Sequence, residues 1–307
     1  MSDDDIPFNR NFPLKPGVVD QVRRGVRRIL CNNPSPFTFT GTNSYILGHG
    51  NVAIIDPGPD SEQHADALLE AVKGETVTHI IVTHTHRDHS PNTARIKAAT
   101  GAVVYAEGPH RASRPRYESE TISSESGADR DFSPDVTVRD GETINGDGWA
   151  LEAVATPGHT ANHMAFAWRD RKYLFVGDHV MGWSTSIVAP PDGSMSDYMA
   201  SLHKLTRRDD ELYFSGHGAE IPDGPKFVKF LIRHRLAREA SILHRLAKGE
   251  VDIPTLVRAI YIGLDPRLTA AAGYSVLAHL EDLVARKVVA TDGDPGINGS
   301  YRLANSE

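Results

Sequence analysis

Four residues that can bind metal ions lie within one short run, His-Thr-His-Arg-Asp-His at residues 84–89. The run follows apolar residues 79–82, which predict a buried strand, and Ser90 and Pro91 after it predict the start of a helix. His84 and His86 are two apart in an extended segment and point the same way, and the turn into the helix brings Asp88 and His89 beside them. A solvated His-rich turn is the alternative interpretation, but this density of ligands favours a metal site.

Three further residues of the same types follow apolar runs elsewhere in the chain: His159, Asp178 and His217. A small residue precedes each of them, and glycine there allows close approach of the backbone. Each alone would more often be a structural residue. Together with the first run, they predict one site at the ends of strands.

The combined set of five imidazoles and two carboxylates suits borderline divalent metals, with zinc first and iron or manganese as alternatives. Two such cations would lower the pKa of a shared water and stabilise the attacking and leaving oxygens. We therefore hypothesise metal-assisted hydrolysis, with a bridging hydroxide as nucleophile. Asp88 is the candidate catalytic residue that orients this water and passes on a proton, and a metal-bound water is the alternative proton donor.

The His-x-His-x-Asp-His run resembles the signature of the metallo-β-lactamase superfamily, and the resemblance extends over nearly the whole chain. It implies an αββα sandwich and a dinuclear centre. His84, His86 and His159 would bind one metal, and Asp88, His89 and His217 the other, with Asp178 bridging both.

Three more residues would support these ligands without binding metal. Asp56, in Ile-Asp-Pro-Gly, matches the superfamily's strand-end aspartate, which steadies the ligand loop; a turn-capping role is the simpler interpretation. His163 and His179 match histidines that do not bind metal in related hydrolases.

The position that carries cysteine in true metallo-β-lactamases is Asp178 here. This difference favours thioesterases, lactonases, phosphodiesterases and nucleases over antibiotic hydrolysis, which would remain a weak side activity. The flanking segments 33–38, 41–45, 83–90, 156–164, 231–244 and 259–283 resemble the β-lactamase-like protein 2 family, whose animal members cut single-stranded RNA in mitochondria. Pro91-Asn92 departs from that family's small glycines and weakens any transfer of specificity.

Strands and helices alternate over the first part of the chain, which predicts an α/β domain at residues 1–224. Residues 225–307 instead predict a winged-helix-like domain of three helices and a hairpin. The predicted strands are 44–47, 52–55, 79–82, 103–105, 151–155, 164–168, 173–176 and 211–214, with helices at 60–72, 91–100 and 195–207. The predicted C-terminal helices are 227–247, 253–262 and 269–285, with strands at 288–291 and 300–303.

Composition narrows the function classes. With 307 residues, 39% of them hydrophobic, the chain is long enough for two folded domains, and its one cysteine, Cys31, excludes an intramolecular disulfide framework. No apolar stretch approaches the length of a membrane span, and no segment reads as a secretory signal, so we expect no membrane association and a cytoplasmic location. The net charge of −7 provides no overall cation for nucleic acid.

Local basic clusters still offer contacts for RNA phosphates. Residues 226–248 hold seven basic residues and one acid, and Lys226, Lys229 and Arg233 are the candidate contacts, although a solvated helical face is the commoner explanation. The polar loop 107–140 adds three arginines beside Tyr117, which could stack on a base. These three are Arg111, Arg114 and Arg116.

Three functions therefore remain open. The first is a phosphodiesterase or endoribonuclease acting on single-stranded RNA, and the second is a hydrolase of small acyl substrates, a thioester or a lactone. The third is a nucleic-acid or protein docking module with a vestigial metal site, which the retention of all seven ligands disfavours. Tyr198 could stabilise charge away from the metals or simply lie in the core. The family resemblance also predicts a homodimer. A narrow apolar pocket would favour acyl substrates, and an open basic groove would favour RNA.

Overall fold

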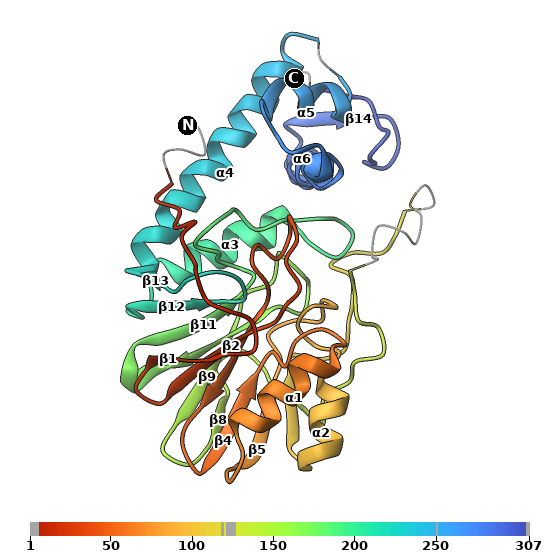
Figure 1. Ribbon diagram of the computed structural model, residues 1–307. Coiled ribbons are helices and arrows are strands. Elements are labelled where there is room, and N and C mark those ends of the chain that lie inside the picture. Colours follow the sequence, from red (N-terminus) through yellow and green to blue (C-terminus); the bar gives the residue numbers. More distant parts are fainter. Residues whose placement is uncertain (1–5, 118–119, 121–126, 250, 305–307) are drawn as a thin grey trace.

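The computed structural model describes residues 6–117, 120, 127–249 and 251–304. Within these residues, a seven-stranded and a six-stranded sheet pack face to face, and helices cover both outer faces (Figure 1). A smaller, mainly helical domain lies at one end of this sandwich. The predicted αββα sandwich with a C-terminal winged-helix-like domain is therefore confirmed.

The first sheet has the strand order β1-β2-β3-β4-β5-β6-β7. Its strands β4, β5 and β6 run parallel, because the intervening helices return the chain across one face. Leu68 and Ile96 anchor these helices on the sheet. The strands are β1 (Val19–Arg23), β2 (Val26–Leu30), β3 (Asn43–Leu47), β4 (Asn51–Ile55), β5 (Thr76–Ile81), β6 (Val103–Ala106) and β7 (Val136–Thr137), and the helices are α1 (Glu62–Ala71) and α2 (Thr93–Thr100).

The second sheet has the order β13-β12-β11-β10-β9-β8, with α3 and the first half of α4 on its outer face. Phe175 and Phe214 stack at 4.8 Å between ring centroids in the core between the two sheets. The strands are β8 (Thr143–Asn145), β9 (Ala150–Ala155), β10 (Met164–Trp168), β11 (Tyr173–Gly177), β12 (Leu212–Ser215) and β13 (Ile221–Pro222), and the helices are a 3₁₀ turn at Arg169–Arg171, α3 (Met195–Leu205) and α4 (Gly224–Leu246).

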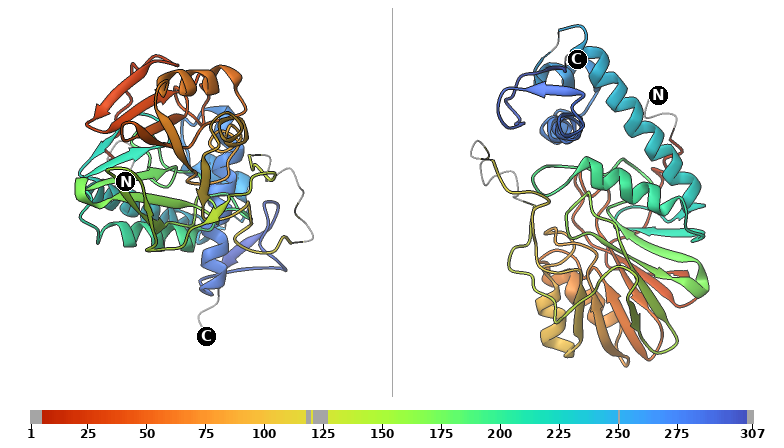
Figure 2. Two further views of the ribbon diagram at one scale, coloured as in Figure 1. Left: turned by 90° about the horizontal axis from the view of Figure 1, so that it is seen from below. Right: turned by 180° about the vertical axis from the view of Figure 1, so that it is seen from behind.

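Helix α4 links the sandwich to the C-terminal domain (Figure 2). Phe227 and Val228 pack in the core against α3, whereas Ile242 and Leu246 pack in the C-terminal core. The boundary between residues 224 and 225 stays a prediction, since this helix contributes to both cores. The other C-terminal elements are α5 (Ile253–Ile260), a 3₁₀ turn at Pro266–Leu268, α6 (Thr269–Ala285), β14 (Val289–Thr291) and β15 (Tyr301–Leu303). Of the helices in the described ranges, none has both the length and the apolarity to cross a membrane.

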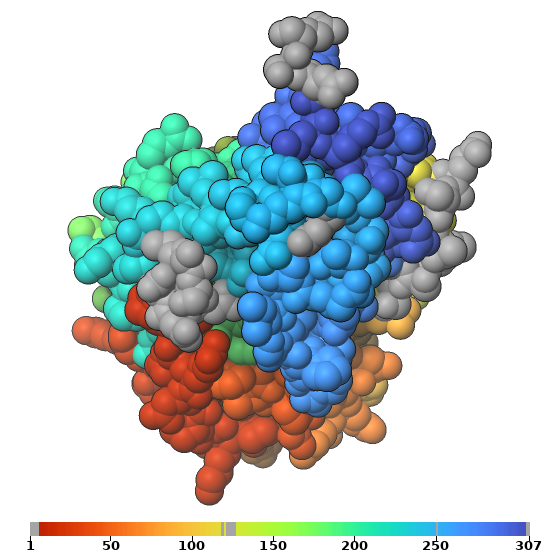
Figure 3. Space-filling model, turned by 90° about the horizontal axis from the view of Figure 1, so that it is seen from above, coloured from red at the N-terminus to blue at the C-terminus, as the bar shows by residue number. Residues whose placement is uncertain are grey.

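Helix α6 returns from the C-terminal domain to the sandwich. Ala278 packs into the core beneath α3, and Glu281 pairs with Arg114 of the long loop after β6. The C-terminal domain therefore covers one end of the sandwich, as the view from above shows (Figure 3).

The local structure differs from the sequence predictions at several places, among them the hairpin β1-β2 and Ser90. The hairpin β1-β2 was not predicted, because its arginines conceal the strand pattern; Arg28 is buried and pairs with Asp20. Ser90 does not cap a helix, since α2 begins at Thr93 and the Ser90 hydroxyl donates to Asp129 instead.

Candidate metal centre

The predicted ligands follow the carboxyl ends of neighbouring strands. The run at residues 84–89 follows β5, Asp178 directly follows β11, and His217 lies two residues after β12. His159 lies in the turn between β9 and β10. Because these strand ends meet at the end of the sandwich that α6 covers, residues far apart in sequence converge there.

Three histidines form the first donor group. The Nδ1 atom of His86 lies 3.1 Å from His84 Nε2 and 3.0 Å from His159 Nε2. All three nitrogen atoms lie within 4.8 Å of one another. Three imidazole nitrogens facing one point can supply three of the four ligands of a tetrahedral metal site, or three of the five ligands of a five-coordinate one.

Asp88, His89, Asp178 and His217 form the second donor group, and their ligand atoms also lie within 4.8 Å of one another. His217 Nε2 is 3.2 Å from an oxygen of Asp88 and 3.2 Å from Asp178 Oδ2. Asp178 Oδ2 also lies 3.8 Å from His159 Nε2 of the first group. The Asp178 carboxylate therefore lies between the two groups, where a bridging ligand would lie.

Hydrogen bonds donated by their Nδ1 atoms orient three of these imidazoles so that Nε2 faces the site. His159 Nδ1 donates to the carbonyl of Ile187 at 2.6 Å, and His217 Nδ1 donates to the carbonyl of Gly41 at 3.0 Å. His89 Nδ1 donates to Asp56 at 3.0 Å. Since carbonyl and carboxylate oxygens only accept, Nδ1 carries the proton and Nε2 is left as the ligand atom.

Asp56 lies at the centre of this support. Its two oxygens accept from the amide and the hydroxyl of Thr83, and one of them also accepts from His89. The Thr83 hydroxyl in turn accepts from His84 Nδ1 at 3.0 Å. Asp56 also falls geometrically into a group with His84 and His89, but its oxygens are occupied, so we assign it to holding the ligands.

The charges of the second group compensate one another. Burial would lower the pKa of His217, but Asp178 and Asp88 outweigh it and raise the pKa to about 10. Burial would raise the pKa of Asp178, but His217 and His89 hold it well below its usual range. Two neighbouring buried carboxylates thus require positive charge between them, and protonated imidazoles or bound cations can supply it.

The residues present fit two divalent cations. The ligand atoms His89 Nε2 and Asp178 Oδ1 are buried without a hydrogen-bond partner. A Cβ atom on Gly216 would lie 2.3 Å from Asp178 Oδ1, so only glycine leaves that oxygen accessible to a ligand. Imidazole and carboxylate together are a donor set typical of zinc, iron and manganese.

The other two predicted supporting histidines lie beneath the donor groups. His163 is buried, and its Nδ1 atom forms a hydrogen bond of 2.8 Å with the Thr156 hydroxyl. The centroid of its ring lies 5.1 Å from that of His84. His179 is buried against the ring of Tyr198 at 4.6 Å. Tyr198 itself is fully buried, and its hydroxyl donates to the carbonyl of His179. Tyr198 therefore lies in the core, and a role in stabilising charge stays a prediction.

A pocket of about 650 Å³ opens over the donor groups. His86, Asp88, His159, Asp178 and His217 form its floor. Its walls are mainly apolar and come from both domains. They include Phe37, Met181, Ile187, Ala189, Ala270, Ala271 and Tyr274.

The predicted RNA contacts do not line this pocket among the described residues. Lys226, Lys229 and Arg233 are exposed on the first half of α4, whose inner face packs on the second sheet. The loop arginines have other positions: Arg111 pairs with Glu107, Arg114 pairs with Glu120 and Glu281, and Arg116 is exposed. The basic clusters seen in the sequence therefore do not form one groove at the metal centre.

Three residues of the site were not predicted. Asp192 lies 3.5 Å from His86 Nε2 and lines the pocket, and the Thr42 hydroxyl donates to Asp88 at 3.3 Å. Asp129 accepts from the Ser90 hydroxyl and so ties its own loop to the ligand run. No spacing of ligand-type residues marks them, and tertiary contacts bring each of them to the site.

The chain matches two family models. The one described as Metallo-beta-lactamase superfamily matches residues 37–217. The one described as Beta-lactamase associated winged helix domain matches residues 253–298.

The chain is also similar, over most of its length, to named relatives and to solved structures. Atrochrysone carboxyl ACP thioesterase of Passalora fulva is 31% identical over 293 residues, which cover 91% of this chain and 79% of that protein. Beta-lactamase-like protein 2 homolog of Caenorhabditis elegans is 32% identical over 236 residues, covering 76% of this chain and 74% of the relative. The crystal structure of a beta-lactamase domain protein from Burkholderia ambifaria superposes with a TM-score of 0.78 at 19% identity, covering 98% of both chains, and thus shares the fold.

Proposed function

Because the chain belongs to the metallo-β-lactamase superfamily, a superfamily of hydrolases, we propose that it is a metal-dependent hydrolase of acyl substrates, with thioesters first. The relative from Passalora fulva, an acyl carrier protein thioesterase by name, supports this substrate class. Lactones are the second acyl class that the same pocket would accept.

The observation that carries this proposal is the lining of the pocket over the donor groups. Its walls are mainly apolar, and Arg87 is the one basic side chain besides histidine among the described residues that line it. The Arg87 guanidinium donates to the carbonyl of Ala128 at 3.1 Å. A cavity of about 650 Å³ with apolar walls and a polar floor matches a small-molecule site and suits an acyl chain.

In this proposal, His84, His86 and His159 would hold one cation and Asp88, His89 and His217 the second, while Asp178, which lies between the two groups, could contribute to both. The cations would lower the pKa of bound water and polarise the substrate carbonyl. In the hydrolysis, the oxygen of water bonds to the thioester carbon, the C–S bond breaks, and the proton of water ends on the released thiol.

Asp88 is the side chain placed to handle that proton. Burial would raise its pKa, but His89 and His217 keep it well below its usual range, so Asp88 is ionised and can accept a hydrogen bond from a bound water. It lies on the pocket floor, and the Thr42 hydroxyl donates to it and fixes its orientation.

RNA hydrolysis, the first function predicted from the sequence, has weaker support. Phosphate binding needs cations along the path of the chain, and the exposed α4 residues Lys226, Lys229 and Arg233 are absent from the described lining of the pocket. A relative named β-lactamase-like protein 2 homolog keeps this activity worth testing.

A comparison of substrates tests the proposal directly. Purified protein would be supplied with Zn²⁺, Mn²⁺ or Fe²⁺ in turn and offered acyl thioesters of two to ten carbons, a lactone panel, a β-lactam and single-stranded RNA. We expect thioester hydrolysis that a chelator abolishes and that metal restores, with little turnover of the β-lactam or RNA.

The control is Asp178→Asn, which keeps the side-chain size and removes one charge from the second donor group. Full activity after this change would contradict the proposed role of the Asp178 carboxylate in the metal centre. Chelator-sensitive cleavage of RNA without turnover of any acyl substrate would overturn the proposal in favour of the nuclease.

A further inference from the structure

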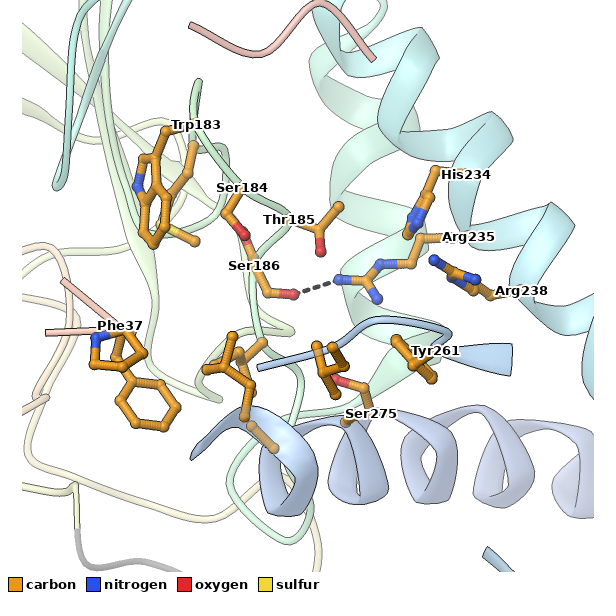
Figure 4. A pocket seen from close by; sticks show the side chains of 17 residues that line it. Phe37, Trp183, Ser184, Thr185, Ser186, His234, Arg235, Arg238, Tyr261 and Ser275 are labelled. Carbon is orange, nitrogen blue, oxygen red and sulfur yellow. Dashed lines mark hydrogen bonds between the residues drawn. The ribbon is translucent and has the colours of Figure 1, made fainter. Parts of the chain in front are cut away.

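A second, smaller pocket lies beside the first, between the loop 181–187, α4 and the C-terminal domain (Figure 4). Its volume is about 120 Å³, enough for a phosphate-sized group or a few waters. Its polar lining includes His234, Arg235 and Arg238 of α4, the hydroxyls of the serines and threonine at 184–186, and Ser275 of α6. None of the described residues that line it is an aspartate or a glutamate.

Arg235 is the key residue of this pocket. Only 3% of its surface is exposed, and its guanidinium donates to the carbonyl of Ser186, as the dashed line in Figure 4 shows. Its guanidinium also lies over the face of the Tyr198 ring, 5.2 Å from the ring centre. A buried guanidinium has five N–H donors and a full charge, and a carbonyl and a ring compensate only part of that charge.

A second arginine lines the same pocket as Arg235. Arg238 lines the same pocket one turn further along α4, with its guanidinium 4.6 Å from the centre of the Tyr261 ring. Burial and then the charge of Arg235 lower the pKa of the buried His279 of α6 well below its usual range, so His279 is neutral and adds no charge. The buried guanidinium of Arg235 is therefore the group that would attract an anion.

The two pockets are neighbours that share walls. Phe37, Met181, Ile187 and Ala271 line both of them. A single elongated ligand could therefore have one end over the metal centre and the other beside Arg235.

We propose that this smaller pocket binds an oxyanion carried by the substrate away from its reacting carbonyl, a phosphate ester of the thiol arm or a terminal carboxylate of the acyl group. This assignment rests on the proposed acyl hydrolase function, and it deepens it by naming a second recognised group. Bidentate guanidinium contacts are the usual way in which proteins hold such oxyanions.

A purely structural role for Arg235 makes a different prediction. The Ser186 hydroxyl donates to the carbonyls of Asp178 and His179, so Arg235 could act only by holding the Asp178 loop. Loss of Arg235 would then reduce metal content and slow all substrates alike. Loss of an anion site would instead raise KM for the charged substrate alone.

The experiment uses two matched pairs of thioesters with the metal-loaded protein. The first pair is butanoyl-pantetheine and butanoyl-4′-phosphopantetheine, which differ in one phosphate. The second is the butanoyl and succinyl thioesters of N-acetylcysteamine, which differ in one carboxylate. The variants are Arg235→Gln, Arg235→Lys and, as a control, Arg258→Gln, an exposed arginine of α5 outside both pockets.

In at least one pair, we expect the charged member to have a kcat/KM about tenfold or more above its neutral partner. This ratio should fall to about one in Arg235→Gln with metal content unchanged, recover in part in Arg235→Lys, and stay at its original value in Arg258→Gln. The pair that responds identifies the source of the oxyanion. Equal turnover within both pairs, or a preference that survives Arg235→Gln, would overturn the proposal.

Two further measurements keep the test decisive. If Arg235→Gln does not fold, Ser275→Glu places a carboxylate in the same pocket and should abolish the preference. If no thioester is hydrolysed, the proposed function fails by itself. The pocket is then judged by thermal unfolding of the native protein, where 4′-phosphopantetheine or succinate should raise Tm and pantetheine or butanamide should not; no shift with either anion would overturn the pocket assignment.

Discussion

The floor and the outer wall of the larger pocket are built by different domains and in different ways. The floor consists of charged and imidazole side chains at the strand ends of the sandwich, and nearly every one is held by a hydrogen bond to a second residue. The wall contributed by α6 consists of Ala270, Ala271 and Tyr274, which contribute shape and little polarity. Chemistry and substrate choice are therefore separable in this molecule.

The separation has a physical basis. Metal ligands tolerate little displacement, so they need the support that Asp56, Gly41 and Ile187 give from the rigid sandwich. Selection of an acyl chain needs only apolar surface of suitable shape, and a helix packed on the sandwich can supply it. Four changes, from the largest expected effect to the smallest, would test this division.

Replacement of Asp178 by alanine should have the largest effect. The carboxylate that lies between both donor groups is lost, so we expect metal content to fall and turnover to drop by roughly 1000-fold. Metal analysis together with kcat for a short thioester would measure this. Retention of both metals and activity would mean that the floor does not act as proposed.

Acid should destabilise the floor through His64, which is buried beneath it and contacts the Ser44 hydroxyl at 2.8 Å. Burial lowers the pKa of His64 from the usual 6.5 to about 4. Between these two values the unfolded chain binds a proton that the folded chain does not, so the free energy of unfolding falls as the pH drops. The contribution of neutral His64 to stability is therefore fully present above pH 6.5 and is lost as the pH falls toward 4. The contribution is about 3 kcal/mol.

Urea unfolding of the metal-free protein at several pH values, compared with His64→Gln, isolates this residue from the other buried histidines. The variant should show a shallower loss of stability between pH 6.5 and 4. Parallel curves for the two proteins would show that His64 is not the group involved.

Replacement of Asp56 by asparagine should weaken the floor without removing a ligand. Asparagine tolerates the left-handed backbone at this position, where φ is 49°. It removes the charge that accepts from His89 and Thr83, so we expect metal affinity to fall by about 10- to 100-fold. Metal titration against a chelating indicator measures this, with the exposed Asp60→Asn as control; equal affinities would leave Asp56 as a turn residue only.

Replacement of Ala270 by phenylalanine should alter the wall alone. The added ring would narrow the pocket, so kcat/KM for a ten-carbon thioester should fall by about tenfold, while that for acetyl thioester and the metal content stay close to wild type. Ala285→Phe, at the far and exposed end of the same helix, is the matched control. An equal loss for both chain lengths would contradict the separation of floor and wall.

The sequence predicted the parts of the site that local geometry controls. His84 and His86 face one way because they are two apart after a strand, and Asp88 and His89 follow in the next turn. Helix α6 and the hairpin β14-β15 were also predicted, because helical periodicity and a Gly-rich turn are local patterns. Asp192 was not, since its only signal is the position to which its loop folds.

The basic residues of α4 show the limit of a local count. Within one stretch of similar charge, Lys229 and Arg233 face solvent, whereas Arg235 points into the protein. The helix turns 100° per residue, so Arg233 and Arg235, which are two residues apart, lie on roughly opposite faces. The local excess of basic residues along α4 predicted a phosphate-binding surface. In the structure, some of these residues are exposed to solvent, whereas Arg235 is buried.

By itself, the sequence determined which groups are available for chemistry and that strand ends present them, because ligand type and short-range spacing are encoded locally. Only the tertiary structure decided what the site can receive. Phe37, Ile187 and Ala270 lie in three separate parts of the chain, and they form one apolar cavity only after the C-terminal domain packs over the sandwich. Pocket shape depends on such long-range packing, whereas the identity of a ligand does not.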